Sequence, residues 1–242
     1  MRDIDAYTQE YLKNSFEDYQ VKYRKHNILK IIQEKKPKTI LEIGCGTEPL
    51  FLDIDMNEVS LYTVVEPSKV FFEHAKDVSM GQKKIQVVND FFENFNNQDS
   101  LKYDLIVCSG LLHELANPET ILEHAKIFMN SHSIFYANVP NAKSFHRLLA
   151  LEMGMIDSIY QMSERNIQLQ QSSVYDKDSL NQLLIQNGFL VIEDGSYFVK
   201  PFDHKHMEWL VEKMGESVLE GLDKMIEYMP DLGSEIFAIC KL

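Results

Sequence analysis

The segment 39–48, with the sequence TILEIGCGTE, constrains the fold of this 242-residue chain more than any other segment does. Its first five residues are apolar and β-branched enough to form a buried strand. Gly44 and Gly46 follow, and glycine both adopts a positive φ and lets a ligand approach the backbone, because it has no Cβ. A glycine turn after a buried strand is typical of open parallel sheets, which bind nucleotides outside the carboxyl ends of their strands.

The residues around this turn distinguish two kinds of nucleotide cofactor. A dinucleotide site uses the pattern G-x-G-x-x-G, but Pro49 stands where its third glycine would be. Glu42, Gly44 and Gly46 instead form the pattern E-x-G-x-G, which resembles the first motif of the class I S-adenosylmethionine-dependent methyltransferases. In that family the acidic residue and the glycine turn cradle the methionine half of the cofactor. Glu48 departs from the family, which often has a further glycine there, so the course of the loop stays open.

Two later positions match the same family in the expected order. Glu66 follows the apolar run 61–65, 20 residues after Gly46, a distance that suits a carboxylate binding both ribose hydroxyls. Asp90 and Phe91 follow the next apolar run. In the family an acidic residue there binds the adenine amino group, and its apolar neighbour packs on the ring. An alternative for Asp90 is the N-cap of a short helical turn, which does not exclude the ligand role.

The segment 103–114 resembles the family's fourth motif, whose strand end lies beneath the methyl group and begins the substrate site. His113 lies at this expected mouth and is the candidate general base, while Glu114 would orient it or hold a substrate hydroxyl. A base accelerates attack by a neutral hydroxyl by about 10²–10⁴-fold, whereas a phosphate, carboxylate or amine can react without one. The alternative is that His113 and Glu114 only begin a helix.

An N-terminal helical segment adds one more expected cofactor contact. In class I methyltransferases such a segment often folds over the cofactor, and the resemblance then implies that Arg24 pairs with the cofactor carboxylate. A solvated charge on the helix is the alternative for Arg24. The cofactor-binding residues expected from motif and resemblance are Arg24, Glu42, Gly44, Cys45, Gly46, Glu66, Pro67, Asp90, Phe91 and Ser109.

The segment 138–147 is the expected substrate contact. It follows a predicted strand and opens a predicted helix, so its backbone N–H groups are expected to face an anion. Arg147 would clamp phosphate or carboxylate with two hydrogen bonds, the alternative being a charge on a surface helix. The stretch resembles a subgroup of class I methyltransferases encoded with bacterial surface-polysaccharide and sugar-nucleotide pathways. We therefore expect Asn141, His146 and Arg147 to bind the substrate.

The alternation of apolar runs and helical patterns predicts an α/β fold with a doubly wound, Rossmann-like sheet. The resemblance implies seven strands in the order 3-2-1-4-5-7-6, the last one antiparallel. We expect a single methyltransferase domain, residues 1–242, with an N-terminal helical cap at 1–36 and substrate-side helical insertions at 142–176 and 203–230. The first insertion is predicted to contain a helical piece at 155–165, and the second to be one long amphipathic helical region.

Composition limits the partners and the location of the protein. A formal net charge of −13 argues against general binding to nucleic acid or to an anionic membrane surface, which require clustered Lys and Arg. No apolar run reaches the roughly 20 residues of a membrane span, and the first residues are too polar for a signal peptide. Three distant cysteines indicate reduced thiols and a cytoplasmic protein. A monomer or homodimer is expected, and the weak DHKH pattern at 203–206 leads us to expect no metal.

Taken together, the motifs predict an S-adenosylmethionine-dependent methyltransferase acting on a small molecule. The leading expectation is methylation of an oxygen on a saccharide or on a phosphate- or phosphoramidate-containing precursor of a bacterial capsule or surface glycan. A small-molecule N-methyltransferase and a quinone-type O-methyltransferase are the enzyme alternatives. A dinucleotide-binding oxidoreductase is a different class, and Pro49 and Asp90 count against it.

Overall fold

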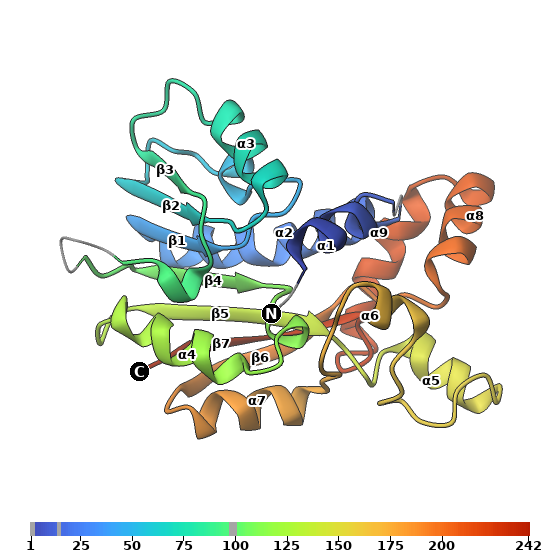
Figure 1. Ribbon diagram of the computed structural model, residues 1–242. Coiled ribbons are helices and arrows are strands. Elements are labelled where there is room, and N and C mark those ends of the chain that lie inside the picture. Colours follow the sequence, from blue (N-terminus) through green and yellow to red (C-terminus); the bar gives the residue numbers. More distant parts are fainter. Residues whose placement is uncertain (1–2, 14–15, 97–100) are drawn as a thin grey trace.

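The computed structural model describes residues 3–13, 16–96 and 101–242, which form a seven-stranded sheet with helices on both faces (Figure 1). The strand order is β3-β2-β1-β4-β5-β7-β6. Strands β1 to β5 pair in parallel, and β7 is antiparallel to both β5 and β6. The predicted strand order and the antiparallel last strand are therefore confirmed.

The elements alternate along the chain as the apolar runs predict. The strands are β1 (Thr39–Ile43), β2 (Leu61–Val65), β3 (Ile85–Val88), β4 (Leu105–Ser109), β5 (Ile134–Pro140), β6 (Leu190–Tyr197) and β7 (Glu235–Lys241). The α-helices are α1 (Ile4–Tyr11), α2 (Glu17–Lys35), α3 (Lys69–Val78), α4 (Pro118–Ile127), α5 (Phe145–Glu152), α6 (Glu164–Gln168), α7 (Lys177–Gln186), α8 (His204–Met214) and α9 (Ser217–Lys224). The short 3-10 turns are η1 (Leu50–Asp53), η2 (Phe92–Asn94), η3 (Leu112–Glu114) and η4 (Met225–Glu227).

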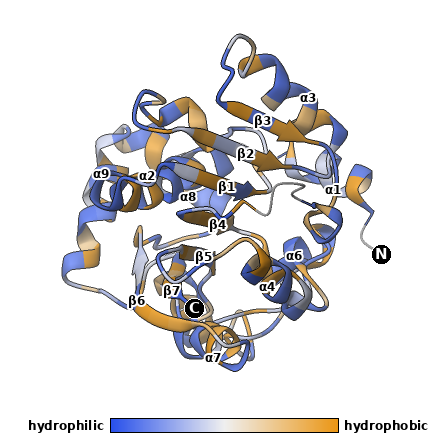
Figure 2. Cartoon of the chain, turned by 90° about the vertical axis from the view of Figure 1, so that its left-hand side faces the viewer, coloured by the Kyte–Doolittle hydropathy of each residue, from blue (hydrophilic) through white to orange (hydrophobic). Residues whose placement is uncertain are grey.

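Two hydrophobic cores lie on opposite faces of the sheet, because successive strand residues point to opposite sides. Ile40 belongs to the core that packs against α2, α3, α8 and α9. Leu41 belongs to the core that packs against α4 and α7. Figure 2 shows the apolar strands between helices whose outer sides are hydrophilic. Burial on both faces explains why the strands read as continuous apolar runs rather than as alternating ones.

The sheet also fixes where a ligand can bind. β1 pairs with β2 on one side and with β4 on the other, so the chain changes direction across the sheet next to β1. A crevice opens at such a switch point, outside the carboxyl ends of the strands. The turn at Gly44 and Gly46 and the residue Glu66 lie at these ends.

Two helix predictions were wrong in their details. The predicted piece 155–165 is irregular up to residue 163, where Arg147 donates hydrogen bonds to the carbonyls of Ile159 and Gln161, and α6 begins only at Glu164. The predicted long helix after residue 203 breaks at Gly215, whose φ of +78° is incompatible with a continuing helix, and α8 and α9 result.

The glycine at position 233 should be essential to the packing of the loop before β7. A Cβ there would lie 2.5 Å from the carbonyl oxygen of Tyr197 and 2.6 Å from Oγ of Ser196. We expect Gly233→Ala to lower the free energy of unfolding by about 1–3 kcal/mol, since the backbone cannot move aside as a flexible side chain does.

Gly221→Ala is the matched control, because a Cβ in α9 meets nothing within 4 Å. It should stabilise the protein by about 0.5–1 kcal/mol through helix entropy. Urea unfolding of both variants checks this, and equal effects would contradict it.

Candidate active site

A cavity of about 850 Å³ opens at the carboxyl ends of β1, β2, β4 and β5. The N-terminal helices α1 and α2 and the segment around α5 and α6 form its other walls. Fourteen of the fifteen site residues expected from the sequence line this cavity, and Asp90 is the exception. Those that line the cavity are Arg24, Glu42, Gly44, Cys45, Gly46, Glu66, Pro67, Phe91, Ser109, His113, Glu114, Asn141, His146 and Arg147.

Asp90 is the expected cofactor residue that lies outside the cavity lining. Its Oδ1 accepts hydrogen bonds from the backbone N–H of Phe91 at 2.8 Å and from the side-chain amide of Asn94 at 2.9 Å. Asp90 therefore fixes the turn that leads into η2, but the N-cap of η2 is Phe91, so the capping alternative for Asp90 was wrong. Phe91 lines the cavity. Binding of the adenine amino group by Asp90 stays a prediction.

The glycine turn is held by the carboxylate of Glu66. Gly44 and Gly46 have φ values of +74° and +57°, which only glycine adopts without strain. Oε2 of Glu66 accepts hydrogen bonds from the N–H groups of Cys45 at 2.9 Å and Gly46 at 3.3 Å, and Oε1 accepts one from Ser68 at 2.8 Å. Burial raises the pKa of Glu66, and these N–H groups offset part of that rise.

Glu42 holds the other end of the same loop, at Leu50. Its carboxylate accepts hydrogen bonds from the N–H of Leu50 at 3.3 Å and from the hydroxyl of Tyr62 at 2.8 Å. The side chain is buried, and burial raises its pKa to about 7. Glu42 thus shapes the loop between Gly44 and Leu50. Sequence reasoning missed Tyr62, since a tyrosine in a buried strand gives no sign of its polar partner.

Arg24 is a buried ion-pair residue rather than a solvated helix charge. Its side chain is 16% exposed, so the alternative considered for it is wrong. The guanidinium donates hydrogen bonds to Glu235 at 3.0 and 3.2 Å and to Glu17 at 3.2 Å. Burial opposes the charge of Arg24, but these two carboxylates outweigh burial and raise its pKa. The guanidinium also lies 3.8 Å from where a Cβ of Gly110 would stand, so it flanks the loop after β4. Its contact with the cofactor carboxylate stays a prediction.

Glu235 is a cavity residue that sequence reasoning missed. Its side chain accepts hydrogen bonds from Arg24, from the amide of Asn138 at 2.7 Å and from the hydroxyl of Tyr197. Burial works against its charge, but Arg24 and Tyr197 together lower the pKa of Glu235. The available signal was an acidic residue opening the otherwise apolar run 235–240.

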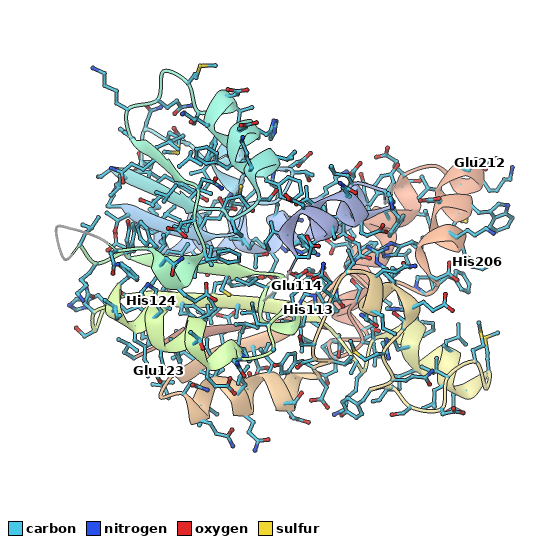
Figure 3. All side chains as sticks on the ribbon, in the orientation of Figure 1. His113, Glu114, Glu123, His124, His206 and Glu212 are labelled. Atoms are coloured by element: carbon cyan, nitrogen blue, oxygen red, sulfur yellow. The ribbon has the colours of Figure 1, made fainter. Side chains whose placement is uncertain are left out.

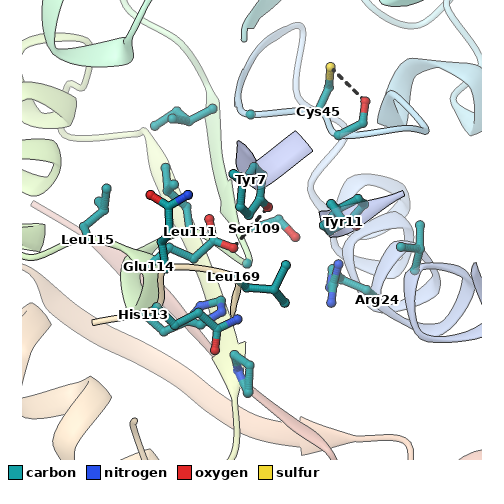
Figure 4. A pocket seen from close by; sticks show the side chains of 18 of the residues that line it. Tyr7, Tyr11, Arg24, Cys45, Ser109, Leu111, His113, Glu114, Leu115 and Leu169 are labelled. Carbon is teal, nitrogen blue, oxygen red and sulfur yellow. Dashed lines mark hydrogen bonds between the residues drawn. The ribbon is translucent and has the colours of Figure 1, made fainter. Parts of the chain in front are cut away.

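His113 and Glu114 belong to η3, directly after β4, and both side chains are buried. Oε1 of Glu114 accepts a hydrogen bond from the hydroxyl of Tyr7 at 3.1 Å. Figure 4 shows this bond, with Arg24 and Tyr11 across the cavity from His113 and Glu114. In Figure 3 the pair lies at the centre of the molecule, far from His206 on α8. The site thus brings the candidate base and its acidic neighbour to the cavity, while their catalytic roles stay predictions.

The segment after β5 differs from the expected anion site. Backbone N–H groups of Ser144, Phe145 and Arg147 donate to the carbonyls of Asn141, Leu232 and Ser144, so the expectation that they face an anion was wrong. The side-chain amide of Asn141 donates to the carbonyls of Asp231 at 3.0 Å and Gly233 at 2.9 Å, and its Oδ1 accepts from Lys143. The polar atoms of Asn141 therefore fix this loop. Its contact with substrate stays a prediction.

The sheet order, the glycine turn after β1 and the buried carboxylate after β2 define the class I fold of S-adenosylmethionine-dependent methyltransferases. A family model described as a methyltransferase domain matches residues 11–194, and the chain belongs to this family. A search of curated proteins by sequence gives no significant match.

Solved structures of methyltransferases share this fold. The plantazolicin methyltransferase BamL, solved with a triazolic desmethylPZN analog and SAH, is 17% identical, with 90% of this chain and 84% of that chain covered and a TM-score of 0.59. The N-methyltransferase NodS from Bradyrhizobium japonicum WM9, solved with S-adenosyl-L-homocysteine, is 12% identical, with 94% and 88% covered and a TM-score of 0.56. A putative S-adenosylmethionine-dependent methyltransferase from Listeria monocytogenes is 15% identical, with 89% and 95% covered and a TM-score of 0.59.

The cofactor is S-adenosylmethionine, and the residues present fit it. A Cβ on Gly44 would stand 3.9 Å from Oε2 of Glu66, and one on Gly46 would stand 3.9 Å from the hydroxyl of Tyr11, so these glycines leave open the space beside the loop. Glu66 would accept hydrogen bonds from the ribose hydroxyls, and Phe91 would provide an apolar surface for the adenine. When bound, the cofactor supplies a methyl group activated by its sulfonium.

Two further observations concern the described residues alone. No group of three or more His, Cys, Asp or Glu side chains among them is placed to hold a metal ion. No helix in this part of the chain combines the length and apolar character needed to cross a membrane.

The raised pKa of Glu42 predicts a pH dependence of stability. Between its ordinary pKa of 4.5 and about 7, the folded chain keeps a proton on Glu42 that the unfolded chain has lost. The free energy of unfolding of the wild type, relative to Glu42→Gln, should therefore fall as pH rises from 5 to 7.5, by up to about 1.4 kcal/mol per pH unit. Urea unfolding at both pH values measures this. Glu58→Gln removes a carboxylate that is 67% exposed and is the matched control. A pH-independent gap between wild type and Glu42→Gln would contradict the prediction.

Proposed function

We propose that the chain methylates an oxygen of a small molecule, a saccharide or a phosphate- or phosphoramidate-containing precursor of a bacterial capsule or surface glycan. The observation that carries this proposal is the position of the arginines. The chain has four, and Arg24, Arg147 and Arg165 line the cavity of about 850 Å³. Arg24 and Arg165 pair with Glu235 and Glu17, whereas Arg147 donates only to carbonyls, and a cation of this kind in a chain with a formal net charge of −13 favours an acceptor that bears an anion or many hydroxyl groups.

In this proposal the cavity has two halves. The cofactor half consists of the glycine turn with Cys45, together with Glu66, Pro67, Phe91 and Ser109. The acceptor half begins at His113 and Glu114 and extends to the segment after β5. Holding the acceptor oxygen against the methyl carbon is the main task of such a site, and orientation contributes up to about 7–11 kcal/mol in the best intramolecular cases.

His113 would act as general base for a hydroxyl acceptor, with Glu114 as its neighbour in the same turn. Support comes from their shared burial in the cavity wall and from the hydrogen bond that Tyr7 donates to Glu114. That bond orients the carboxylate of Glu114 toward α1. A phosphate oxygen would need no base, so the requirement for His113 separates the two kinds of acceptor.

We also propose that residues 1–242 act as one methyltransferase domain and that the reaction takes place in the cytoplasm. Support for the location comes from Cys45, Cys108 and Cys240, which are all buried and free. Such thiols are typical of a reducing compartment. A monomer or a homodimer stays our expectation for the assembled state.

Methyl transfer to defined acceptors tests the proposed function. We expect radiolabelled methyl from S-adenosylmethionine to reach a sugar phosphate, phosphoramidate or a free sugar, and calorimetry to show binding of S-adenosyl-L-homocysteine. Glu66→Ala should weaken that binding at least tenfold, because it removes the acceptor for the ribose hydroxyls and the support of the glycine turn. Transfer to amines alone would replace the proposal with small-molecule N-methylation, the activity named for NodS.

The effect of His113→Ala tests the role of the base. With a hydroxyl acceptor we expect kcat to fall by about 10²–10⁴-fold while KM changes little. His206→Ala is the matched control, because His206 is 67% exposed and lies on α8 away from the cavity. Turnover close to that of the wild type would remove His113 as base and favour an acceptor that is already ionised.

A further inference from the structure

The helical insertions form one part of the cavity wall. In this part the cationic side chains outnumber the carboxylates. Five side chains from α5, α6 and the segment between β6 and α8 line it there: His146, Arg147, Arg165, Lys200 and His204. We call them the basic cluster. Their charges influence one another, because Lys200 and Arg147 lower the pKa of His146, and Lys200 and Arg165 lower that of His204, in each case after burial. The five groups therefore share one region of the cavity.

Among the described residues, neither Arg147 nor Lys200 makes a hydrogen bond or ion pair with a carboxylate, although Glu17 and Glu235 lie near enough to Lys200 to favour its charge. Arg147 donates to the carbonyls of Ile159 at 2.9 Å and Gln161 at 2.6 Å. Lys200 is 5% exposed, and its Nζ donates to Oε1 of Gln20 at 2.8 Å. All of these acceptors are neutral. An ammonium has three donors and a guanidinium five, so both groups keep donors for a ligand.

The other cations of this wall are already neutralised. Arg165 pairs with Glu17 at 2.9 Å, and Arg24 pairs with Glu235. Glu17 and Glu235 thus face four cations, namely Arg24, Arg147, Arg165 and Lys200, so this wall carries an excess of about two positive charges. Next to them, Nδ1 of His146 is buried and has no hydrogen-bond partner among the described residues. Burying a polar atom without a hydrogen-bond partner costs free energy. The Nδ1 atom therefore indicates a hydrogen-bonding ligand that the free protein lacks.

We propose that the basic cluster binds a dianionic phosphoryl group on the methyl acceptor, with Arg147 and Lys200 as its charge partners and His146 as a hydrogen-bonding partner. This inference rests on the proposed function, since it takes this part of the cavity as the acceptor site. A phosphoryl group carries about −1.5 to −2 charges at pH 7 and offers three strong acceptor oxygens. A carboxylate would balance only one of the two cations, and a neutral sugar would balance neither.

Binding of simple sugars to the protein saturated with S-adenosyl-L-homocysteine tests this inference. Glucose 1-phosphate is the probe, and glucose and gluconate are the comparison ligands. By isothermal titration calorimetry we expect glucose 1-phosphate to bind at least tenfold more tightly than gluconate, and glucose to give no measurable binding. Raising the salt concentration should weaken binding of the phosphate only modestly, because the cations are buried.

Lys200→Met removes the buried ammonium with little change of volume and should weaken glucose 1-phosphate at least tenfold. Lys205→Met is the matched control, since Lys205 carries the same charge five residues further along, is exposed and does not line the cavity. It should bind glucose 1-phosphate as the wild type does. Arg147→Met is a second variant with the same expected loss. Unchanged binding of S-adenosyl-L-homocysteine by each variant establishes that it has folded.

The outcomes separate this inference from the proposed function. Equal affinity for glucose 1-phosphate and gluconate, no binding of the phosphate, or equal effects of Lys200→Met and Lys205→Met would overturn the phosphoryl site. Each of these results leaves methyl transfer to a sugar or another small molecule in place. Failure of the wild type to bind S-adenosyl-L-homocysteine would instead overturn the proposed function itself.

Discussion

The buried carboxylate of Glu235 joins the two ends of the chain at the cavity, and the shape of the site depends on it. It stands at the start of β7 and accepts hydrogen bonds from Arg24 on α2 and from Asn138 on β5. Removing one partner of such a buried pair costs about 3–5 kcal/mol, because the remaining charge is left without its partner. The cap helix, the centre of the sheet and the last strand are therefore held in one arrangement, with the guanidinium beside the loop that follows β4.

The charges around this anchor divide the cavity into two chemical environments. At the glycine turn, the carboxylates of Glu42 and Glu66 are bound by backbone N–H groups and by Tyr62 rather than by cations. That end suits a cofactor with an ammonium group and ribose hydroxyls. At the insertions, the cations outnumber the carboxylates, as Arg147 and Lys200 show. The strongly negative formal charge of the chain thus gives no indication of the local charge that an acceptor meets.

The sequence located what local pattern determines, namely the strands, the glycine turn and the acidic residue after β2. It failed where a residue's role depends on a distant partner. Arg24 and Glu235 are 211 positions apart, and no spacing rule connects them. The break of the last long helix at Gly215 lies inside an unbroken apolar stripe, so periodicity could not reveal it. Asn141 is a further example, because its side-chain amide donates a hydrogen bond to the carbonyl of Asp231, 90 positions later in the chain.

The buried ammonium of Lys200 gives the free protein a cation that is already positioned and desolvated before an anion binds. Burial lowers its pKa to about 8, so at neutral pH it remains protonated although its environment opposes the charge. Gln20 supplies a neutral oxygen, and the charge is incompletely solvated. A dianion entering the cavity would therefore meet a cation that has already lost its water. The attraction between the two is stronger there than in solution, and little rearrangement is needed to form the contact. The free energy needed to desolvate Lys200 is thus spent when the protein folds. It does not have to be spent again when the anion binds.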